Sequence, residues 1–239
     1  SQFKDSLSQL DSDGFCVFSI SSCDHQVSNN DLLNEWNEAF NICEEEGIVT
    51  DNTIYDNDTV VNRRTFIPKK EIKNIFTNTI TIFNSSYVRS ILSSYIGREI
   101  NDDYLIDQKL WFDDVNNGII FCSANELHTD IYYSTLKLWI FIEDVNDESS
   151  PLAYCKNSHL FSLKRCSFEY RKSINYMKEN DFSWRVQGDS IASNIKNKTL
   201  VTTSAGSVVI ADTHGFHARH FSCKKSSRKQ IHISLRYKP

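Results

Sequence analysis

His128 and Asp130 are the two side chains whose types and spacing first point to metal chemistry in this sequence. One residue, Thr129, separates them, and the residues on either side are typical of extended chain. Side chains two apart on a strand share one face, so both groups can reach the same ion. Alone, such a triplet is equally well explained by a polar strand end at the surface. A metal site therefore needs a third ligand from elsewhere in the chain.

Three histidines near the C-terminal end are candidates for that third ligand: His214, His217 and His220. Two histidines and one carboxylate on one face of an octahedral metal leave half of its positions open for substrates, and this set is typical of non-haem iron(II) oxygenases. The residue types do not decide which histidine is the ligand. An arrangement in which all three form a separate metal site is an alternative.

At these residues the chain resembles the phytanoyl-CoA dioxygenase-like family of iron(II)- and 2-oxoglutarate-dependent oxygenases. The resemblance covers roughly residues 100–239 and, more loosely, the helices before them. It rests on His128-Thr129-Asp130, residues 138–145 leading to Asn157-Ser158-His159, residues 206–213 leading to His217, and Arg228.

The resemblance also chooses among the three histidines. The family pattern here is similar to Asp-Thr-x-Gly-x-His, which residues 212–217 match, and Arg228 follows His217 by eleven residues, an interval like the family's. It therefore implies His128, Asp130 and His217 as catalytic residues and metal ligands. The other two histidines are expected to line the mouth of the pocket or to face solvent.

Arg228 is the expected partner of the distal carboxylate of 2-oxoglutarate. A guanidinium fork matches a planar carboxylate with two charge-assisted hydrogen bonds, which lysine cannot reproduce. Every second residue from Arg228 to Ser234 is polar and the residues between are mostly aliphatic, so we expect the polar face to line the barrel and the aliphatic face to meet helices. An ordinary half-exposed strand, with its polar face in water, is the alternative.

Trp139 and Gln108 are further candidates for contacts to the cosubstrate. Trp139 matches an aromatic position near the cosubstrate in some relatives, although a core tryptophan explains it equally well. Two positions depart from the family pattern. Arg219 stands where relatives often have a small hydroxyl residue, and Ser150 stands where many have a glycine before the proline. A proline turn can still form without the glycine if Ser150 stays extended, so this departure is mild.

The activity implied by the resemblance is hydroxylation of a small-molecule C–H bond, with release of succinate and CO2. It requires Fe(II), 2-oxoglutarate as cosubstrate, and O2. Halogenating relatives replace the carboxylate ligand by a small residue, so Asp130 favours hydroxylation, with desaturation and ring closure still open. Two alternatives remain: a non-catalytic cupin-like binding domain with a vestigial metal triad, and a different metal-dependent enzyme on the same barrel. The sequence does not identify the primary substrate.

The elements that must position these residues are expected to be mainly strands with flanking helices, arranged as a double-stranded β-helix, the cupin-like jelly roll. This expectation rests partly on the resemblance. We predict one domain over 1–239, with helical support over about 1–100, a jelly-roll core over about 101–239 and a variable insert over about 161–197. The polar stretch 49–68 is predicted to be a long loop. The expected strands are 15–20, 104–112, 118–123, the region of His128, 135–142, 152–155, 199–203, 207–211 and 229–237.

Composition excludes several classes of function. The net charge of −5 and the absence of long Lys or Arg runs argue against duplex nucleic acid as a partner. Seven irregularly spaced cysteines without a Cys-x-x-Cys motif are not typical of a disulfide framework or a structural zinc site. No apolar run approaches the ~20 residues of a membrane span, and no signal pattern opens the sequence. We therefore expect a cytoplasmic protein that acts on a small molecule.

Overall fold

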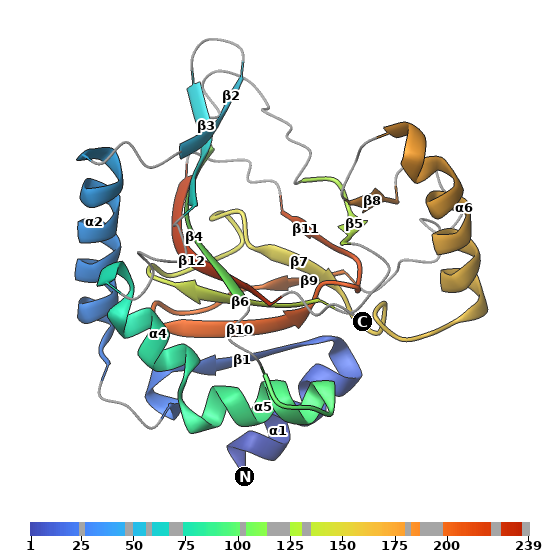
Figure 1. The fold of residues 1–239 in the computed structure, drawn as a ribbon, viewed down its shortest axis with the longest axis horizontal. Coiled ribbons are helices and arrows are strands. Elements are labelled where there is room, and N and C mark those ends of the chain that lie inside the picture. The colour runs from blue at the N-terminus through green and yellow to red at the C-terminus, as the bar shows by residue number, and fades with distance from the viewer. Residues whose placement is uncertain are drawn as a thin grey trace.

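The chain folds into two antiparallel β-sheets that carry helices on their outer faces (Figure 1). The structure, a computed structural model, describes residues 1–23, 27–45, 50–55, 59–66, 74–100, 104–113, 125–130, 135–179, 183–186, 198–220 and 226–235. This arrangement agrees with the mainly β fold with flanking helices that the sequence predicts.

The larger sheet holds the strand that carries Arg228. Its strand order is β1-β10-β6-β12-β4-β3-β2. In that order the strands are Phe15–Ser19, Ser207–Asp212, Leu136–Phe141, Ser226–Leu235, Tyr104–Asp113, Thr59–Phe66 and Thr50–Tyr55. All its pairings are antiparallel, and apart from the consecutive strands β2 and β3 its neighbouring strands come from distant parts of the chain.

The smaller sheet holds the strands that carry the two histidines of the predicted triad. Its strand order is β8-β5-β11-β7-β9. In that order the strands are Trp184–Arg185, His128–Thr129, His217–Arg219, Leu152–Cys155 and Lys198–Val201.

Helices cover the outer faces of both sheets. They are α1 Gln2–Asp13, α2 Asn29–Glu45, α4 Thr77–Phe83, α5 Ser86–Ile96 and α6 Leu163–Glu179, with a short 3-10 turn, η1, at Ile20–Ser22. Local sequence sets their ends: α1 stops at Gly14, which adopts a left-handed φ of 86°, and the Ser85 side chain caps the start of α5. Among the described residues, no helix is both long and apolar enough to cross a membrane.

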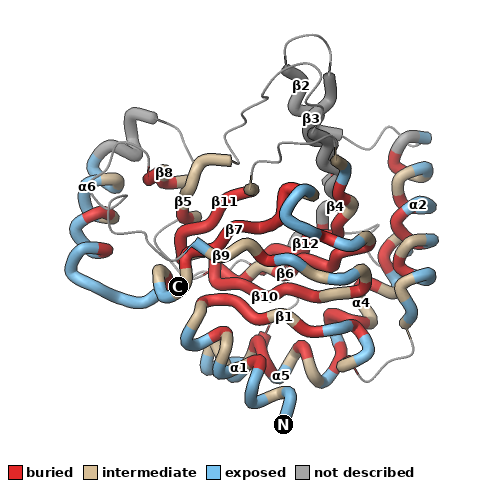
Figure 2. The backbone as a smooth tube through the Cα atoms, turned by 180° about the vertical axis from the view of Figure 1, so that it is seen from behind, coloured by how far each residue is buried: buried red, intermediate tan, exposed pale blue. Residues whose placement is uncertain are grey.

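Polar and aliphatic side chains alternate along β12 and lie on its two opposite faces. Ile231, Ile233 and Leu235 are buried in the core between the larger sheet and helices α1, α2, α4 and α5. Arg228, Gln230, His232 and Ser234 are also buried, on the opposite face. Trp139 and Phe141 of β6 lie in the core between the two sheets. The Trp139 and His232 rings are tilted by 38° with centroids 5.3 Å apart, and the Arg228 guanidinium lies 5.8 Å from the centroid of the Phe141 ring. The polar face of β12 therefore points into the interior, as predicted, and not into water (Figure 2).

The prediction of a long loop over 49–68 is wrong. Residues Thr50–Tyr55 and Thr59–Phe66 form an antiparallel ribbon, and β3 extends the larger sheet by pairing with β4. The polar residues of this stretch hide the alternation that normally identifies a strand. Backbone pairing with the neighbouring strand stabilises extended chain whatever the side chains are.

Other expected elements match the structure closely. Helices α1, α2, α4 and α5 lie within the expected helical support over about 1–100, and α6 lies within the expected insert over about 161–197. The strand predicted over 118–123 lies outside the described residues. The division into one domain with an insert stays a prediction.

Candidate metal centre

The structure brings His128, Asp130 and His217 together. One ligand atom from each side chain lies within 4.8 Å of the others, and no other cluster of this kind occurs among the residues that the structure describes. The two imidazole rings lie 4.5 Å apart, centroid to centroid, at an angle of 53°. Two nitrogens and one carboxylate at this spacing can bind one divalent metal ion.

Pairing of strands in the smaller sheet produces this convergence. His217 on β11 is the direct cross-strand partner of His128 on β5, and the backbone N–H of Asp130 donates to the carbonyl of Thr213 at 3.0 Å. Directly opposed residues of an antiparallel pair have their Cβ atoms about 4.5–5.5 Å apart. Two ligands 89 residues apart in sequence are therefore neighbours because of the register alone.

Hydrogen bonds at Nδ1 of both His128 and His217 leave the same ring atom, Nε2, to bind a metal. His128 Nδ1 donates to the Glu126 carbonyl at 2.7 Å, and His217 Nδ1 donates to the Gly215 carbonyl at 2.9 Å. These bonds fix the tautomer that leaves the Nε2 lone pair available. Burial lowers the pKa of His128, and burial together with the neighbouring His128 lowers the pKa of His217 to about 3. Both imidazoles are therefore neutral ligands at neutral pH.

Asp130 is held in its ionised form by Lys137 of β6. Burial alone would raise the pKa of Asp130, but the Lys137 ammonium and the two imidazoles outweigh burial and hold it well below its usual range. Lys137 and Asp130 form an ion pair through the Oδ2 atom of the carboxylate. The ion pair gives the partly buried ammonium of Lys137 an anionic partner.

Arg228 lies on the interior face of the larger sheet. Its side chain is 5% exposed, its Nη1 atom donates to the Ser150 carbonyl, and its guanidinium lies over the Phe141 ring at 5.8 Å. The metal triad therefore faces the interior from the smaller sheet, and the Arg228 guanidinium faces the same interior from the larger sheet.

Solved structures of other proteins match the fold of this chain, whereas the sequence comparisons find no match. No family model and no protein of curated function matches the sequence. The epimerase SnoN in complex with Fe3+, alpha ketoglutarate and nogalamycin RO matches with a TM-score of 0.67 at 10% identity, over 100% of this chain and 86% of that chain. The non-heme alpha ketoglutarate dependent carbocyclase SnoK from nogalamycin biosynthesis matches at 0.59 and 14%, over 97% and 82%. HygX from Streptomyces hygroscopicus, with nickel and 2-oxoglutarate bound, matches at 0.52 and 16%, over 97% and 85%.

This chain has their fold. The predicted jelly-roll class is thereby confirmed. At identities of 10% to 16% the likeness concerns the fold, and membership of the phytanoyl-CoA dioxygenase-like family stays a prediction.

The other predicted site residues have different surroundings. Trp139 is a core residue between the sheets, 7% exposed, and it borders the interior through His232. Gln108 lies on β4 opposite Ile231, whose side chain packs on the helices, while the Gln108 side chain lies outside the described residues. The cosubstrate contact of Gln108 therefore stays a prediction.

The two departures from the family pattern both lie at the interior. Arg219 is 5% exposed and pairs across the strands with Leu152, which lies in the core between the sheets, so position 219 faces inward. Its Nη2 atom donates to Asn125 Oδ1 at 3.3 Å. Ser150 does not stay extended: its φ is 53°, in the left-handed region that favours glycine, and its carbonyl accepts from Arg228 Nη1.

The close approach of Gly215 to Tyr154 predicts a first mutational effect. A Cβ on Gly215 would overlap the Tyr154 hydroxyl and lie 2.5 Å from the ring atom Cζ, and this ring is fully buried with its hydroxyl donating to the Asp212 carbonyl at 2.7 Å. Gly215→Ala should therefore lower the free energy of unfolding in urea by about 1–3 kcal/mol. The double variant with Tyr154→Phe should recover only part of this loss, because Cζ remains. A wild-type unfolding free energy for Gly215→Ala would contradict the close contact.

His214 and His220 are not part of the triad. His220 is partly exposed, and its backbone N–H donates to the Pro151 carbonyl at 2.8 Å. His214 Nε2 lies 2.5 Å from Glu169 Oε1 of α6, and the same oxygen accepts from Arg165 Nε at 2.6 Å. The insert helix thus makes polar contacts with the loop before His217, which no pattern in the sequence indicated.

Glu169 should make stability depend on pH. Burial raises its pKa, but hydrogen bonds from His214 and Arg165 outweigh burial, and the net pKa is lowered from the usual 4.5. A carboxylate with a lowered folded pKa stabilises the fold above its unfolded pKa, and this contribution disappears as pH falls through the folded pKa. Glu169→Gln should therefore cost about 1.5–3 kcal/mol at pH 7 in urea unfolding, and much less at a pH below the lowered folded pKa of Glu169. A cost that is equal at both pH values would contradict this role.

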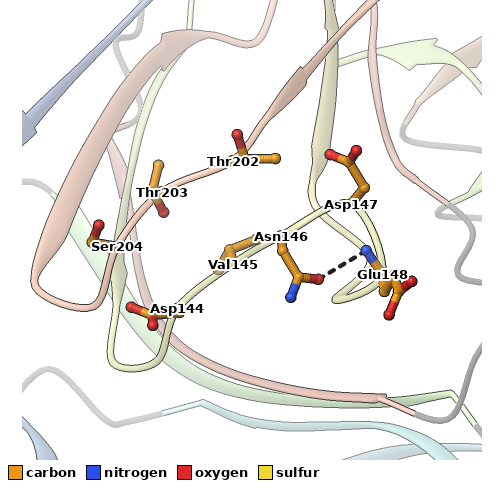
Figure 3. A pocket seen from close by; sticks show the side chains of 8 residues that line it. All are labelled: Asp144, Val145, Asn146, Asp147, Glu148, Thr202, Thr203 and Ser204. Atoms are coloured by element: carbon orange, nitrogen blue, oxygen red, sulfur yellow. Dashed lines mark hydrogen bonds between the residues drawn. The ribbon is translucent and has the colours of Figure 1, made fainter.

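A separate surface pocket of about 720 Å³ lies between the loops that follow β6 and β9 (Figure 3). It is lined by Asp144, Val145, Asn146, Asp147, Glu148, Thr202, Thr203 and Ser204. Several of its polar groups hold the loops themselves: Asn146 Oδ1 accepts from the Glu148 N–H at 2.9 Å, and Asp144 Oδ1 accepts from the Ala205 N–H at 2.7 Å. The pocket lies beyond the end of β6 that is remote from Lys137, so it is not part of the triad site.

Proposed function

We propose that this chain is an Fe(II)- and 2-oxoglutarate-dependent oxygenase that hydroxylates a C–H bond of a small molecule, with release of succinate and CO2. The observation that carries the proposal is the convergence of His128, Asp130 and His217 inside the fold of non-haem iron enzymes. The similar proteins are described as an epimerase, a carbocyclase and a protein with nickel and 2-oxoglutarate bound, so the cosubstrate is better supported than the reaction type.

The donor set fits ferrous iron. Two neutral imidazoles with free Nε2 atoms and one ionised carboxylate form the facial arrangement that leaves the opposite half of an octahedron open. All-sulfur or all-oxygen ligation, which would favour structural zinc or calcium, is absent from this cluster. Bound iron would supply the oxygen activation that no protein side chain provides.

The chain's own residues would bind and orient the cosubstrate. Arg228 projects from β12 into the interior and offers a planar donor fork to the distal carboxylate of 2-oxoglutarate. Phe141 lies beside the guanidinium in the apolar core between the sheets, to which Trp139 also belongs, and exclusion of water there strengthens charge-assisted hydrogen bonds. Asp130, as the carboxylate ligand, occupies the position that halogenating relatives leave open, which favours hydroxylation.

The deciding experiment is anaerobic addition of iron(II) and then 2-oxoglutarate to the purified apoprotein. A weak visible charge-transfer band that requires both additions is expected for the wild type and not for His128→Ala. Admission of oxygen should then produce succinate from 2-oxoglutarate. If the wild type gives neither band nor succinate, the oxygenase proposal is wrong and a cupin-like binding domain with a vestigial triad is the better description.

A further inference from the structure

Arg165 of α6 is a buried charge in a helix that is otherwise mostly exposed on its outer side. The Arg165 side chain is 3% exposed, whereas Leu163 is 82% and Tyr170 is 68% exposed. A buried guanidinium is costly unless its donors are satisfied, so its partners show what the position is used for.

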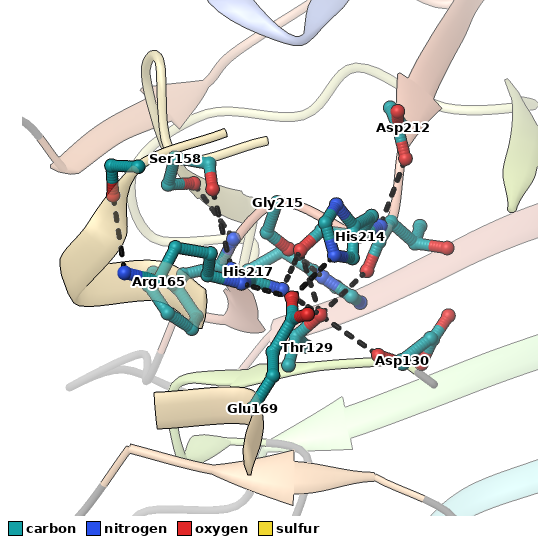
Figure 4. Close-up of polar contacts among 12 residues, drawn as sticks. Thr129, Asp130, Ser158, Arg165, Glu169, Asp212, His214, Gly215 and His217 are labelled. Atoms are coloured by element: carbon teal, nitrogen blue, oxygen red, sulfur yellow. Dashed lines mark hydrogen bonds and ion pairs between the residues drawn. The ribbon is translucent and has the colours of Figure 1, made fainter. Parts of the chain in front are cut away.

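The guanidinium reaches three separate segments of the chain (Figure 4). Nη1 donates to the Ser158 carbonyl at 3.2 Å, Nη2 donates to Thr129 Oγ1 at 2.8 Å, and Nη2 also donates to the His214 carbonyl at 2.5 Å. Nε donates to Glu169 at 2.6 Å, which supplies the opposite charge. All three nitrogens of the guanidinium are therefore used.

Two of these partners belong to the two arms of the metal triad. Thr129 is the spacer between His128 and Asp130, and its side chain points away from the shared face of the two ligands. His214 opens the turn that leads to His217. The Thr129 hydroxyl also donates to the His214 carbonyl at 2.7 Å, so both arms and Arg165 form one hydrogen-bonded unit.

The Arg165 guanidinium also packs on the aromatic ring of Phe216. The Arg165 guanidinium lies 4.3 Å from the ring centroid of Phe216, the residue that precedes His217. Apolar contacts hold α6 against the smaller sheet: Phe168 is fully buried with Cys155, Trp184 and Phe216 on the outer face of that sheet. The Phe168 ring lies 5.8 Å from the same guanidinium but takes part in none of its hydrogen bonds, so the hydrogen bonds of Arg165 can be removed while the apolar contacts of α6 remain.

We propose that Arg165 is a positioning residue for the metal centre, which sets the separation of the His128–Asp130 arm from the His217 arm and so couples α6 to metal affinity. The proposal rests on the proposed function in that the triad must bind a metal. Metal–ligand distances tolerate errors of only about 0.2 Å. Changes just outside the ligands typically cost 10–100-fold in metal affinity.

The test compares Arg165→Met, Arg165→Lys and Phe168→Leu, with Co(II) as an anaerobic spectroscopic probe of the triad. Arg165→Met should weaken Co(II) binding by about 10–100-fold and alter its visible ligand-field spectrum. Arg165→Lys keeps the charge but loses the fork, so it should restore only part of the affinity. Phe168→Leu should lower the free energy of unfolding, while Co(II) affinity stays within about threefold and the spectrum is unchanged.

A second variant guards against failure of Arg165→Met to fold. Thr129→Val keeps the shape of the spacer and removes the hydroxyl that joins Arg165 to the His214 carbonyl, and it should weaken Co(II) binding in the same direction. Wild-type affinity and spectrum in Arg165→Met, or in Thr129→Val if only that variant folds, would overturn the proposal. Absence of Co(II) binding in the wild type would instead refute the proposed function itself.

Discussion

Replacing His217 by alanine should abolish metal binding at the triad while the chain still folds. Loss of a group just outside the ligands costs 10–100-fold in affinity, so loss of a ligand should cost at least about 100-fold. The imidazole is buried and neutral, with a pKa of about 3, so its removal leaves no unpaired charge. Truncation should then cost a few kcal/mol at most in the free energy of unfolding. Anaerobic Co(II) titration and urea unfolding measure the two effects separately.

His220→Ala is the matched control for this prediction. It removes the same side chain three residues downstream, where the imidazole is partly exposed and belongs to no ligand cluster among the described residues. Its Co(II) affinity should equal that of the wild type. If His220→Ala loses binding and His217→Ala retains it, the choice among the histidines is wrong and the metal site lies elsewhere.

The local part of the triad was predictable, and the long-range part was predictable only through the resemblance. His128 and Asp130 share a face because side chains alternate along extended chain, and that rule needs no tertiary information. The place of His217 depends on its register opposite His128 across strands of two and three residues. Strands this short carry no periodic signal, so residue types alone left three histidines open.

The role of α6 could not be predicted, because its polar residues look like those of a solvent-exposed helix. Arg165 and Glu169 have the spacing of an ordinary surface ion pair. Only tertiary packing makes this pair buried and directs the guanidinium to Thr129 and the His214 carbonyl. The nearest local signal is Phe168 between them, an apolar residue that marks this face of the helix as the one that docks.

The ribbon β2–β3 was missed for a related reason. Sequence patterns identify strands through one apolar face, and the stretch from Thr50 to Phe66 is too polar to show one. Its place in the sheet is set by backbone pairing of β3 with β4, which side-chain patterns do not report.

Replacing Arg228 by methionine should weaken 2-oxoglutarate binding strongly and leave metal binding unchanged. Removal of one partner of a buried, hydrogen-bonded charge pair costs about 2–5 kcal/mol, which corresponds to about 30-fold to 5,000-fold in Kd. Arg228 lies on the other sheet from both histidines, so the triad should keep its Co(II) affinity. Titration of the Co(II) or Fe(II) protein with 2-oxoglutarate, followed by the change in its visible spectrum, measures the loss.

Lys229→Met and Arg228→Lys separate the position from the charge. Lys229 is the next residue on β12, and its ammonium contacts Glu143 at 3.0 Å and lies over the Trp36 ring on the helix side of the sheet. Lys229→Met should therefore bind 2-oxoglutarate as the wild type does. Arg228→Lys keeps a cation but loses the planar fork, so it should bind more weakly than the wild type and more tightly than Arg228→Met. Wild-type affinity in Arg228→Met would show that another interior cation holds the distal carboxylate, and Arg219, which faces the same interior from the smaller sheet, would be the first to test.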